Sequence, residues 1–243
     1  MPDAMKPEPF PDHDIRRVLA VVAHPDDMEY GWSAVVHHWT AAGVEVAYLL
    51  LTHGEAGMQI DPAEVGPLRA AEQRAACDAV GVERLTLLNH ADGRLMPTLD
   101  LRRDIAREIR TFRPDAVLTM TWDVVAPWGL NQADHRAAGL STLDGCRDAD
   151  NTWVFPDLAE TGLAKWGPAW LLVGGTSDPN YGIALEPADV DAAVRSLAAH
   201  EAYLAALGPD YPAPDDFLRP AFKGQGEALG TEDAYLFTGH RLR

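Results

Sequence analysis

Four polar or turn-forming residues end the first strongly apolar segment of the chain. Residues 18–23 read VLAVVA, which predicts a short buried strand, and His24, Pro25, Asp26 and Asp27 follow it directly. Buried charge is costly unless it is paired or bound to a metal. The carboxyl end of a strand in an open α/β sheet is also where ligands usually bind. We therefore expect these polar side chains to hold a ligand.

The residue types favour a metal ion as that ligand. Imidazole nitrogen and carboxylate oxygen both bind Zn²⁺, and a catalytic zinc site keeps three protein ligands and one open position. His24 and Asp27 are three residues apart across a turn, so both can reach one ion, which leaves Asp26 free to act as a base. The best candidate for the third ligand is His135, which follows a later predicted strand. We expect one zinc per chain, with another divalent metal as the alternative.

Other interpretations of these two segments stay open. HPDD alone can be a turn in which Asp26 caps the next helix, and DHR alone (residues 134–136) can form a surface ion pair. A dinucleotide site is disfavoured, because the turn after the first strand should then be rich in glycine. Here that turn is acidic and free of glycine, so it would repel phosphate.

The rest of the sequence alternates strand and helix patterns. This alternation predicts a three-layer, Rossmann-like α/β fold with a mostly parallel, twisted sheet and helices on both faces. The predicted strands are residues 18–23, 44–51, 84–88, 116–121 and 169–173, with shorter candidates at 182–185 and 235–238. The predicted helices are residues 30–42, 67–80, 99–112, 134–146 and 187–207.

We expect a single domain over residues 1–243. Residues 1–14 are rich in proline and predict an extended N-terminal arm, and residues 147–167 predict an irregular segment. The tail from Gly208 predicts mostly loop.

Composition limits the partners and the compartment. The net charge is −17 at pH 7, which argues against nucleic acid or an anionic membrane as a partner. The chain shows neither a signal peptide nor an apolar run long enough to span a membrane, so we expect a cytoplasmic protein. Its two cysteines, Cys77 and Cys146, lie in helical patterns and are expected to be buried free thiols.

Several segments together resemble one known family. AHPDDME (residues 23–29) and the later DHR are similar to the signatures of the LmbE/PIG-L family of zinc-dependent N-deacetylases. Weaker support comes from THGEAG at residues 52–57, the RxxE spacing of Arg69 and Glu72, ADG at 91–93 and SLAAHEAYL at 196–204. The resemblance covers most of the chain.

The resemblance implies an LmbE-like fold and removal of acetyl groups from N-acetylglucosamine units of varied conjugates. It implies zinc bound by His24, Asp27 and His135, with Asp26 as general base. Asp134, which precedes a ligand, would orient an imidazole ring. The family includes oligomers, so a homo-oligomer stays open.

One departure from the family lies beside the third ligand. The family usually reads HPDH there, whereas this chain has Gln132 in the place of the first histidine. An amide can donate a hydrogen bond but cannot transfer a proton at neutral pH. If Gln132 occupies that place, acid catalysis falls to Asp26 or to another histidine, with His200 and His53 as candidates. For His200, a core or surface role is the more common one for a histidine on an amphipathic helix.

Four further residues have competing interpretations. Arg69 would bind a sugar hydroxyl or carboxylate, or would form a helix-surface ion pair with Glu72. Glu55 follows the second strand and either joins the site or accepts backbone amides in its loop. Trp128 would stack on a sugar ring or an aromatic aglycone, although a lid on the core is slightly favoured. Asp92 is expected to close its own turn.

The residues and the resemblance together predict a zinc-dependent hydrolase that removes an acetyl or acyl group from the amide nitrogen of an N-acetylglucosamine-type sugar or its conjugate. One alternative is an amidase that acts on a thiol conjugate or a secondary-metabolite glycoside. The other is a metal-binding family member that has lost turnover, because Gln132 replaces a usual catalytic histidine.

Overall fold

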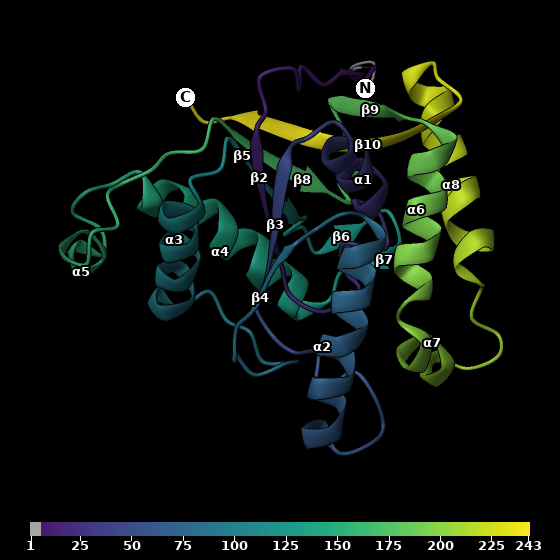
Figure 1. The fold of residues 1–243 in the computed structure, drawn as a ribbon, viewed down its shortest axis with the longest axis horizontal. Helices are drawn as coiled ribbons and strands as arrows, with labels where there is room; N and C mark the ends of the chain where they lie inside the picture. Colours follow the sequence, from purple (N-terminus) through teal and green to yellow (C-terminus); the bar gives the residue numbers. More distant parts are fainter. Residues whose placement is uncertain (1–5) are drawn as a thin grey trace.

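The computed structural model describes residues 6–243 and contains an eight-stranded sheet between two layers of helices (Figure 1). The strand order is β1-β9-β10-β8-β5-β2-β3-β4. The strands of this sheet are β1 (Glu8–Pro9), β2 (Arg17–Val22), β3 (Glu45–Leu50), β4 (Arg84–Leu87), β5 (Ala116–Met120), β8 (Trp170–Gly174), β9 (Tyr181–Leu185) and β10 (Asp233–Arg241). A separate two-stranded hairpin joins β6 (Val125–Ala126) to β7 (Gly129–Leu130).

The sheet is mostly parallel, as the sequence predicts. Strand β2 pairs in parallel with β3 on one side and with β5 on the other, and β3–β4 and β5–β8 are parallel as well. Only β10 runs antiparallel to both of its neighbours. The chain reverses its direction across the sheet at β2, so the loops after β2 and β5 meet at the switch point where ligands bind in such folds.

Strand β2 is buried on both faces, which explains its continuous apolar sequence. Val18, Ala20 and Val22 belong to one hydrophobic core, whereas Leu19 and Val21 belong to the other. Because successive side chains of a strand point to opposite faces, this alternation separates the two cores.

Helices cover each core. The first core contains side chains of α1 (Ser33–Ala41), α2 (Pro62–Ala79), α6 (Pro187–Ala198) and α8 (Pro214–Leu229). The second contains side chains of α3 (Leu99–Phe112), α4 (Ala133–Ala149) and the short α5 (Pro156–Glu160). Figure 1 shows α3 and α4 on one side of the strands and α6 and α8 on the other. The three-layer α/β prediction is therefore confirmed.

The prediction of a loop-rich tail after Gly208 is wrong. The tail forms α8, which has sixteen residues, and the nine-residue β10. Pro220 and the glycines of α8 disfavour a helix. Burial of Leu218 and Phe222 against the core stabilises the helix and overrides that local preference. Gly226 is needed for close packing, since a Cβ there would lie 2.4 Å from the carbonyl oxygen of Glu232.

Other predicted boundaries shift as well. The helix predicted at residues 187–207 divides at His200 into α6 and α7 (Glu201–Leu207). Asp61 caps α2 through the backbone N–H of Ala63, so α2 begins five residues earlier than predicted. The described part of the N-terminal arm forms β1 on the edge of the sheet, and the expected arm at residues 1–5 lies outside the described residues.

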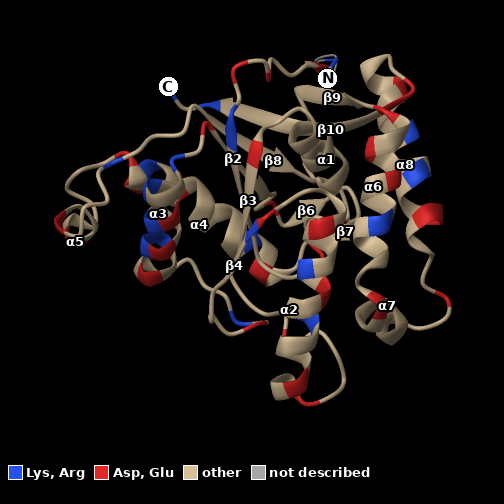
Figure 2. Ribbon diagram, viewed as in Figure 1, with Lys and Arg blue, Asp and Glu red and all other residues tan. Residues whose placement is uncertain are grey.

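Charged residues lie on helices on both sides of the sheet, and acidic residues outnumber basic ones (Figure 2). Helix α3 is rich in arginine, but its two adjacent arginines form ion pairs. Arg102 pairs with Asp148, and Arg103 pairs with Asp157. Cys77 and Cys146 are buried free thiols, as predicted. Over residues 6–243, none of the helices combines the length and the apolar character that crossing a membrane requires.

Candidate active site

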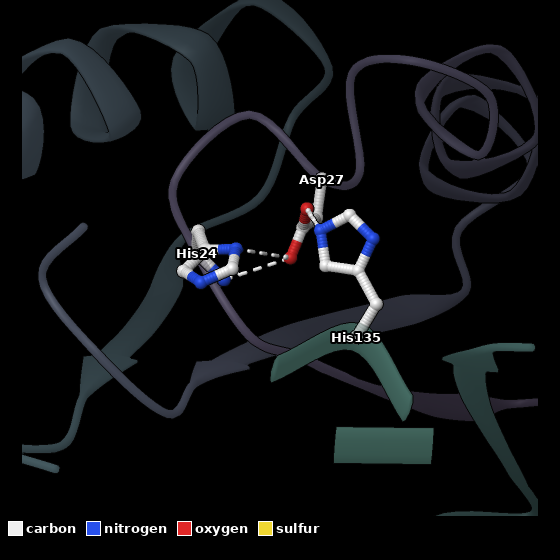
Figure 3. A group of neighbouring side chains, drawn as sticks. All are labelled: His24, Asp27 and His135. Atoms are coloured by element: carbon white, nitrogen blue, oxygen red, sulfur yellow. Dashed lines mark hydrogen bonds and ion pairs between the residues drawn. The ribbon is translucent and has the colours of Figure 1, made fainter. Parts of the chain in front are cut away.

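The loop after β2 and the start of α4 bring three potential metal ligands together. Asp27 lies between the imidazole rings of His24 and His135 (Figure 3). Its Oδ1 is 3.1 Å from Nε2 of His135, and its Oδ2 is 3.6 Å from Nδ1 of His24. The backbone N–H of His24 also donates to Asp27 Oδ2 at 2.7 Å, which fixes the turn. The two predicted segments therefore converge in space.

This donor set fits a divalent metal ion. One ligand atom from each residue lies within 4.8 Å of the other two. Tetrahedral zinc with ligands at about 2.0–2.1 Å would separate neighbouring donor atoms by roughly 3.3 Å. The distances of 3.1 and 3.6 Å from Asp27 to the two imidazoles are close to that value, with each imidazole facing a different carboxylate oxygen.

The second nitrogen of His24 faces two other carboxylates. Its Nε2 lies 3.0 Å from Asp92 Oδ1 and 3.4 Å from Asp134 Oδ2. Asp134 is fully buried and also accepts the backbone N–H groups of Gly93 and Leu95. These three side chains also lie close enough to hold a metal. Asp134 already accepts backbone donors, so the arrangement instead orients the His24 ring with Nδ1 toward Asp27.

Asp26 has a strained backbone that its neighbours hold in place. Its φ angle is 89°, in the left-handed region that non-glycine residues avoid, which typically costs on the order of 1–3 kcal/mol. Its backbone N–H donates to Oε1 of Gln73, and the amide group of Gln73 donates to the buried carboxylate of Glu29. In this conformation Asp26 Oδ1 lies 3.2 Å from the guanidinium of Arg69.

Arg69 is buried and contacts the loop that carries Asp26. Its guanidinium donates to the carbonyl oxygens of Gly54 and Pro25 and lies 3.2 Å from Asp26 Oδ1. The ring of Tyr203, from α7, lies 4.1 Å from the guanidinium carbon in a cation–π contact. The alternative of a helix-surface ion pair is therefore wrong for Arg69.

Burial and these charges shift the acidities of the site. Burial raises the pKa of Asp26 to about 6, although the Arg69 guanidinium opposes that rise. Burial would also raise the pKa of Asp27, but the imidazoles of His135 and His24 outweigh it and lower this pKa. Asp27 is thus held as a carboxylate that can bind a cation, whereas Asp26 titrates close to the range useful for proton transfer.

Gln132 caps α4 at the edge of the site. Its side-chain oxygen accepts the backbone N–H groups of Asp134 and His135. The cap fixes the first helical turn and with it the His135 ring. Gln132 also lines the cavity in front of His24, Asp27 and His135, where its amide group can donate to a bound molecule.

His200 lies behind the site and not in the cavity. It is fully buried at the break between α6 and α7, and its Nε2 lies 3.6 Å from Oε2 of Glu29. Within the described residues, neither ring nitrogen of His200 has a hydrogen-bond partner. Burial lowers its pKa, but the Glu29 carboxylate outweighs this and raises it. His200 does not line the cavity in front of His24, Asp27 and His135.

Three other candidates lie further away. Glu55 accepts the backbone N–H of Asp92, which matches the loop role among its alternatives, and it lines a separate cavity together with His53. Trp128 is 59% exposed, so the preferred interpretation as a lid on the core is wrong.

The prediction for Asp92 also fails. Its carboxylate contacts His24 and accepts the backbone N–H of Ala56, and does not merely close its own turn.

Sequence reasoning missed the residues that hold the loop of Asp26 from other helices. Gln73 of α2 accepts the backbone N–H of Asp26, and Tyr203 of α7 packs against Arg69. Tyr30 lines the cavity and follows the signature directly, so its position in AHPDDMEY was the available signal. For Gln73 and Tyr203 no spacing rule links the helix to the loop before the fold is known.

Polar side chains line most of the cavity in front of the triad. It has a volume of about 330 Å³, and Asp26, Arg69, Asp92 and Gln132 contribute to its wall. The fold and this cavity together define an α/β protein with a candidate metal centre at the carboxyl edge of its sheet, next to a carboxylate suited to proton transfer.

Sequence comparison then identifies the family. Residues 19–144 match the family model described as PIG-L, GlcNAc-PI de-N-acetylase, which covers about half of the chain. The chain therefore belongs to the PIG-L family, whose deacetylases are metal-dependent.

Individual relatives agree with this assignment. The chain is 32% identical over 142 residues to diacetylchitobiose deacetylase of Thermococcus kodakarensis, which covers 56% of this chain and 51% of the relative. It thus matches about half the length of that relative. It is also 30% identical over 233 residues to 1D-myo-inositol 2-acetamido-2-deoxy-alpha-D-glucopyranoside deacetylase of Mycolicibacterium vanbaalenii, covering 79% of this chain and 78% of the relative.

A solved structure shows the same fold. The structure of N,N'-diacetylchitobiose deacetylase from Pyrococcus horikoshii, bound to its inhibitor MPG, superposes with a TM-score of 0.85. The match covers 95% of this chain and 86% of the other at 23% sequence identity.

Proposed function

We propose that this protein is a metal-dependent N-deacetylase that removes the acetyl group from an N-acetylglucosamine-type sugar or its conjugate. The observation that carries the proposal is the convergence of His24, Asp27 and His135 beside Asp26, at the mouth of a polar cavity. The relatives named above carry the names of amino-sugar deacetylases, which supports the same reaction class.

His24, Asp27 and His135 would hold one zinc ion. Two imidazole nitrogens and a carboxylate, with one side open to the cavity, match the donor set of catalytic zinc sites. When bound, the metal would polarise the amide carbonyl and make water a better nucleophile near neutral pH. Asp92 and Asp134 would keep the His24 ring in its ligating orientation.

Asp26 would move the proton in the reaction. It would accept a proton from the attacking water as the new C–O bond forms, and would donate it to the amine nitrogen as the C–N bond breaks. The products are acetate and the free amino sugar. A pKa raised to about 6 by burial lets Asp26 perform both transfers, which reduces the need for the histidine that Gln132 replaces. The polar groups of Arg69, Asp92 and Gln132 would face the sugar.

Two further properties belong to the proposal. A cytoplasmic location is supported by the two free, buried cysteines. A single domain over residues 1–243 is supported by β1 and β10, which bring both ends of the described chain into one sheet.

Acetate release from N-acetylglucosamine, N,N'-diacetylchitobiose and an N-acetylglucosaminyl inositol tests the proposal. We expect turnover of at least one compound, its loss after chelation and its recovery with zinc. Zinc binding at one equivalent without any acetate release would instead support a family member that has lost turnover. In that case Gln132→His should restore activity, whereas in an active enzyme the same change should lower activity by removing the cap of α4.

A further inference from the structure

A second cavity adjoins two of the three candidate metal ligands, Asp27 and His135. It has a volume of about 380 Å³ and shares Asp27, His135 and Tyr30 with the polar cavity. Asp26, Arg69 and Asp92 contribute to the polar cavity and not to this one. A molecule bound at the triad therefore borders both the polar cavity and the second cavity.

The wall of the second cavity is mostly apolar and aromatic. Six aromatic side chains line it: Tyr30, Trp32, Trp128, Tyr211, Phe217 and Tyr235. They come from four segments of the chain, namely the loop after β2, the loop after β5, β10 and the region of α8. This lining resembles ligand pockets in general, which are mostly apolar with a few polar groups at one end.

Contacts between the rings hold this wall in shape. Tyr30 packs edge-on against Phe217 at 5.6 Å, and the Tyr211 hydroxyl donates to the Tyr30 hydroxyl at 2.8 Å. Trp32 packs against Tyr235 at 4.8 Å. The wall therefore has a defined shape and does not depend on a ligand to assemble it.

Two glycines at the end of β8 allow these rings to approach the backbone. A Cβ on Gly174 would lie 2.4 Å from Nε1 of Trp32. A Cβ on Gly175 would lie 2.5 Å from the Trp128 ring, and its φ of +69° also favours glycine. The backbone at this point is thus adapted to the aromatic lining.

The chemistry of the proposed reaction sets which part of a substrate enters each cavity. In amide hydrolysis the leaving nitrogen must receive a proton, and Asp26 is placed to supply it from the polar cavity. The nitrogen and its sugar then lie in the polar cavity. The acyl carbon lies on the opposite side of the scissile bond, so its substituent points toward the second cavity.

We propose that the second cavity binds the acyl chain of the substrate, and that the protein hydrolyses N-acyl amino sugars with chains longer than acetyl. This inference rests on the proposed function and deepens it by naming the acyl group. Water attacks the acyl carbon, the C–N bond breaks and the nitrogen gains the proton. The products are the amino sugar and a carboxylic acid with several methylene groups, and water is the only co-reactant.

Hydrolysis of a chain-length series tests the inference. The substrates are N-acetyl-, N-butyryl-, N-hexanoyl- and N-octanoylglucosamine, and release of the free amine gives kcat/KM for each. Burial of a methylene group is worth about a fourfold change, so kcat/KM should rise at least about tenfold from acetyl to hexanoyl. Hydrolysis of the acetyl compound with a flat or falling series would overturn the acyl assignment and leave the proposed function intact. Absence of turnover on all four would overturn both.

Variants in the aromatic wall locate the effect. Trp128 and Phe217 are 59% and 38% exposed, so Trp128→Ala and Phe217→Ala should leave the core intact. Each should lower kcat/KM for the octanoyl compound at least about fivefold more than for the acetyl compound. Trp153→Ala is the matched control, because Trp153 is 84% exposed and lines neither cavity. An equal loss on both substrates would contradict the assignment.

An aryl glycoside distinguishes the acyl chain from an aglycone. If the cavity instead held an aglycone, p-nitrophenyl N-acetylglucosaminide would exceed methyl N-acetylglucosaminide in kcat/KM, and Trp128→Ala would remove that advantage. This result would overturn the inference. Equal values for the two glycosides, together with a rising acyl series, would support it.

Discussion

The two cavities that meet at the metal triad are built in different ways. Ion pairs and hydrogen bonds to backbone groups hold the polar cavity, and Arg69 and Asp92 each contact more than one loop. Ring-to-ring packing holds the apolar cavity, and the hydroxyl pair of Tyr30 and Tyr211 is the hydrogen bond that joins two of its rings. Asp27, His135 and Tyr30 line both cavities, but the other residues line only one, so substitutions confined to those residues should change the reaction and the substrate range separately.

The largest expected effect comes from removing a ligand that both cavities share. His135→Ala should lower metal affinity and reduce kcat/KM by roughly 10³-fold or more, because the metal loses one of three protein ligands. Metal content by mass spectrometry and amine release measure the two effects. His90→Ala is the matched control, since His90 pairs with Asp104 and lines neither of these cavities. Full activity in His135→Ala would rule out this ligand set.

A smaller loss is expected when only the polar wall is altered. Arg69→Met removes the cation next to Asp26 and the donors to two backbone carbonyl groups. The displaced loop should reduce kcat by about 10²-fold for every acyl length, because small misplacements at a reacting centre have effects of that size.

Arg74→Met, on the same helix but bonded to Val82 and Glu83, is the matched control. A loss in Arg69→Met that depended on acyl length would contradict the separation of the two cavities.

The smallest expected effect is on the free energy of unfolding. It concerns the contact between α1 and α6, and it depends on pH. Asp189 of α6 binds His37 and His38 of α1. Burial would raise the pKa of Asp189, but these histidines outweigh it and lower the pKa. The hydrogen bond that His38 donates to the Asp189 carboxylate raises the pKa of His38.

The signs of these two shifts define a pH window. A lowered carboxyl pKa stabilises the fold above the unfolded value near ~3.9, and this contribution is lost as the pH falls. A raised histidine pKa stabilises the fold below the unfolded value near ~6.5, and this contribution is lost as the pH rises through the raised value. The contact should therefore be strongest between these two limits.

Asp189→Asn tests this window and keeps the acceptor that serves the helix cap. We expect a loss of about 1 kcal/mol in the free energy of unfolding near pH 5.5, a modest value because the His38 side chain is 35% exposed and screened by solvent. The loss should be smaller at pH 9, because the imidazole is then neutral. Urea unfolding at both pH values measures the difference. A loss that is equal at the two pH values would exclude the charged contact.

The sequence predicted the polar site better than the apolar one for a physical reason. A short loop fixes the spacing of His24, Asp26 and Asp27, so their convergence follows from local geometry and residue type. The prediction of His135 also required that the strands at residues 18–23 and 116–121 be neighbours, as they are at the switch point of the common doubly wound strand order. Their metal-binding and catalytic roles stay predictions, although the structure brings all four residues together.

The C-terminal region could not be predicted in the same way. Helix α8 contains Pro220 and two glycines, so local preference opposes the helix that tertiary packing stabilises. The aromatic residues of the second cavity come from distant segments and carry no chemical signature. The function of Asp92 was misjudged for a related reason, because its contact with His24 depends on the fold and not on its own turn.

The central claim is that His24, Asp27 and His135 hold the metal while Asp26 transfers the proton. Asp26→Asn tests it most directly, because the amide keeps the shape of the carboxyl group but cannot act as a base. Zinc content and amine release from the best acyl substrate should be measured on the same purified sample. We predict one zinc per chain, as in the unchanged protein, with kcat reduced by roughly 10³-fold. Activity within tenfold of the unchanged protein at full zinc content would contradict the account.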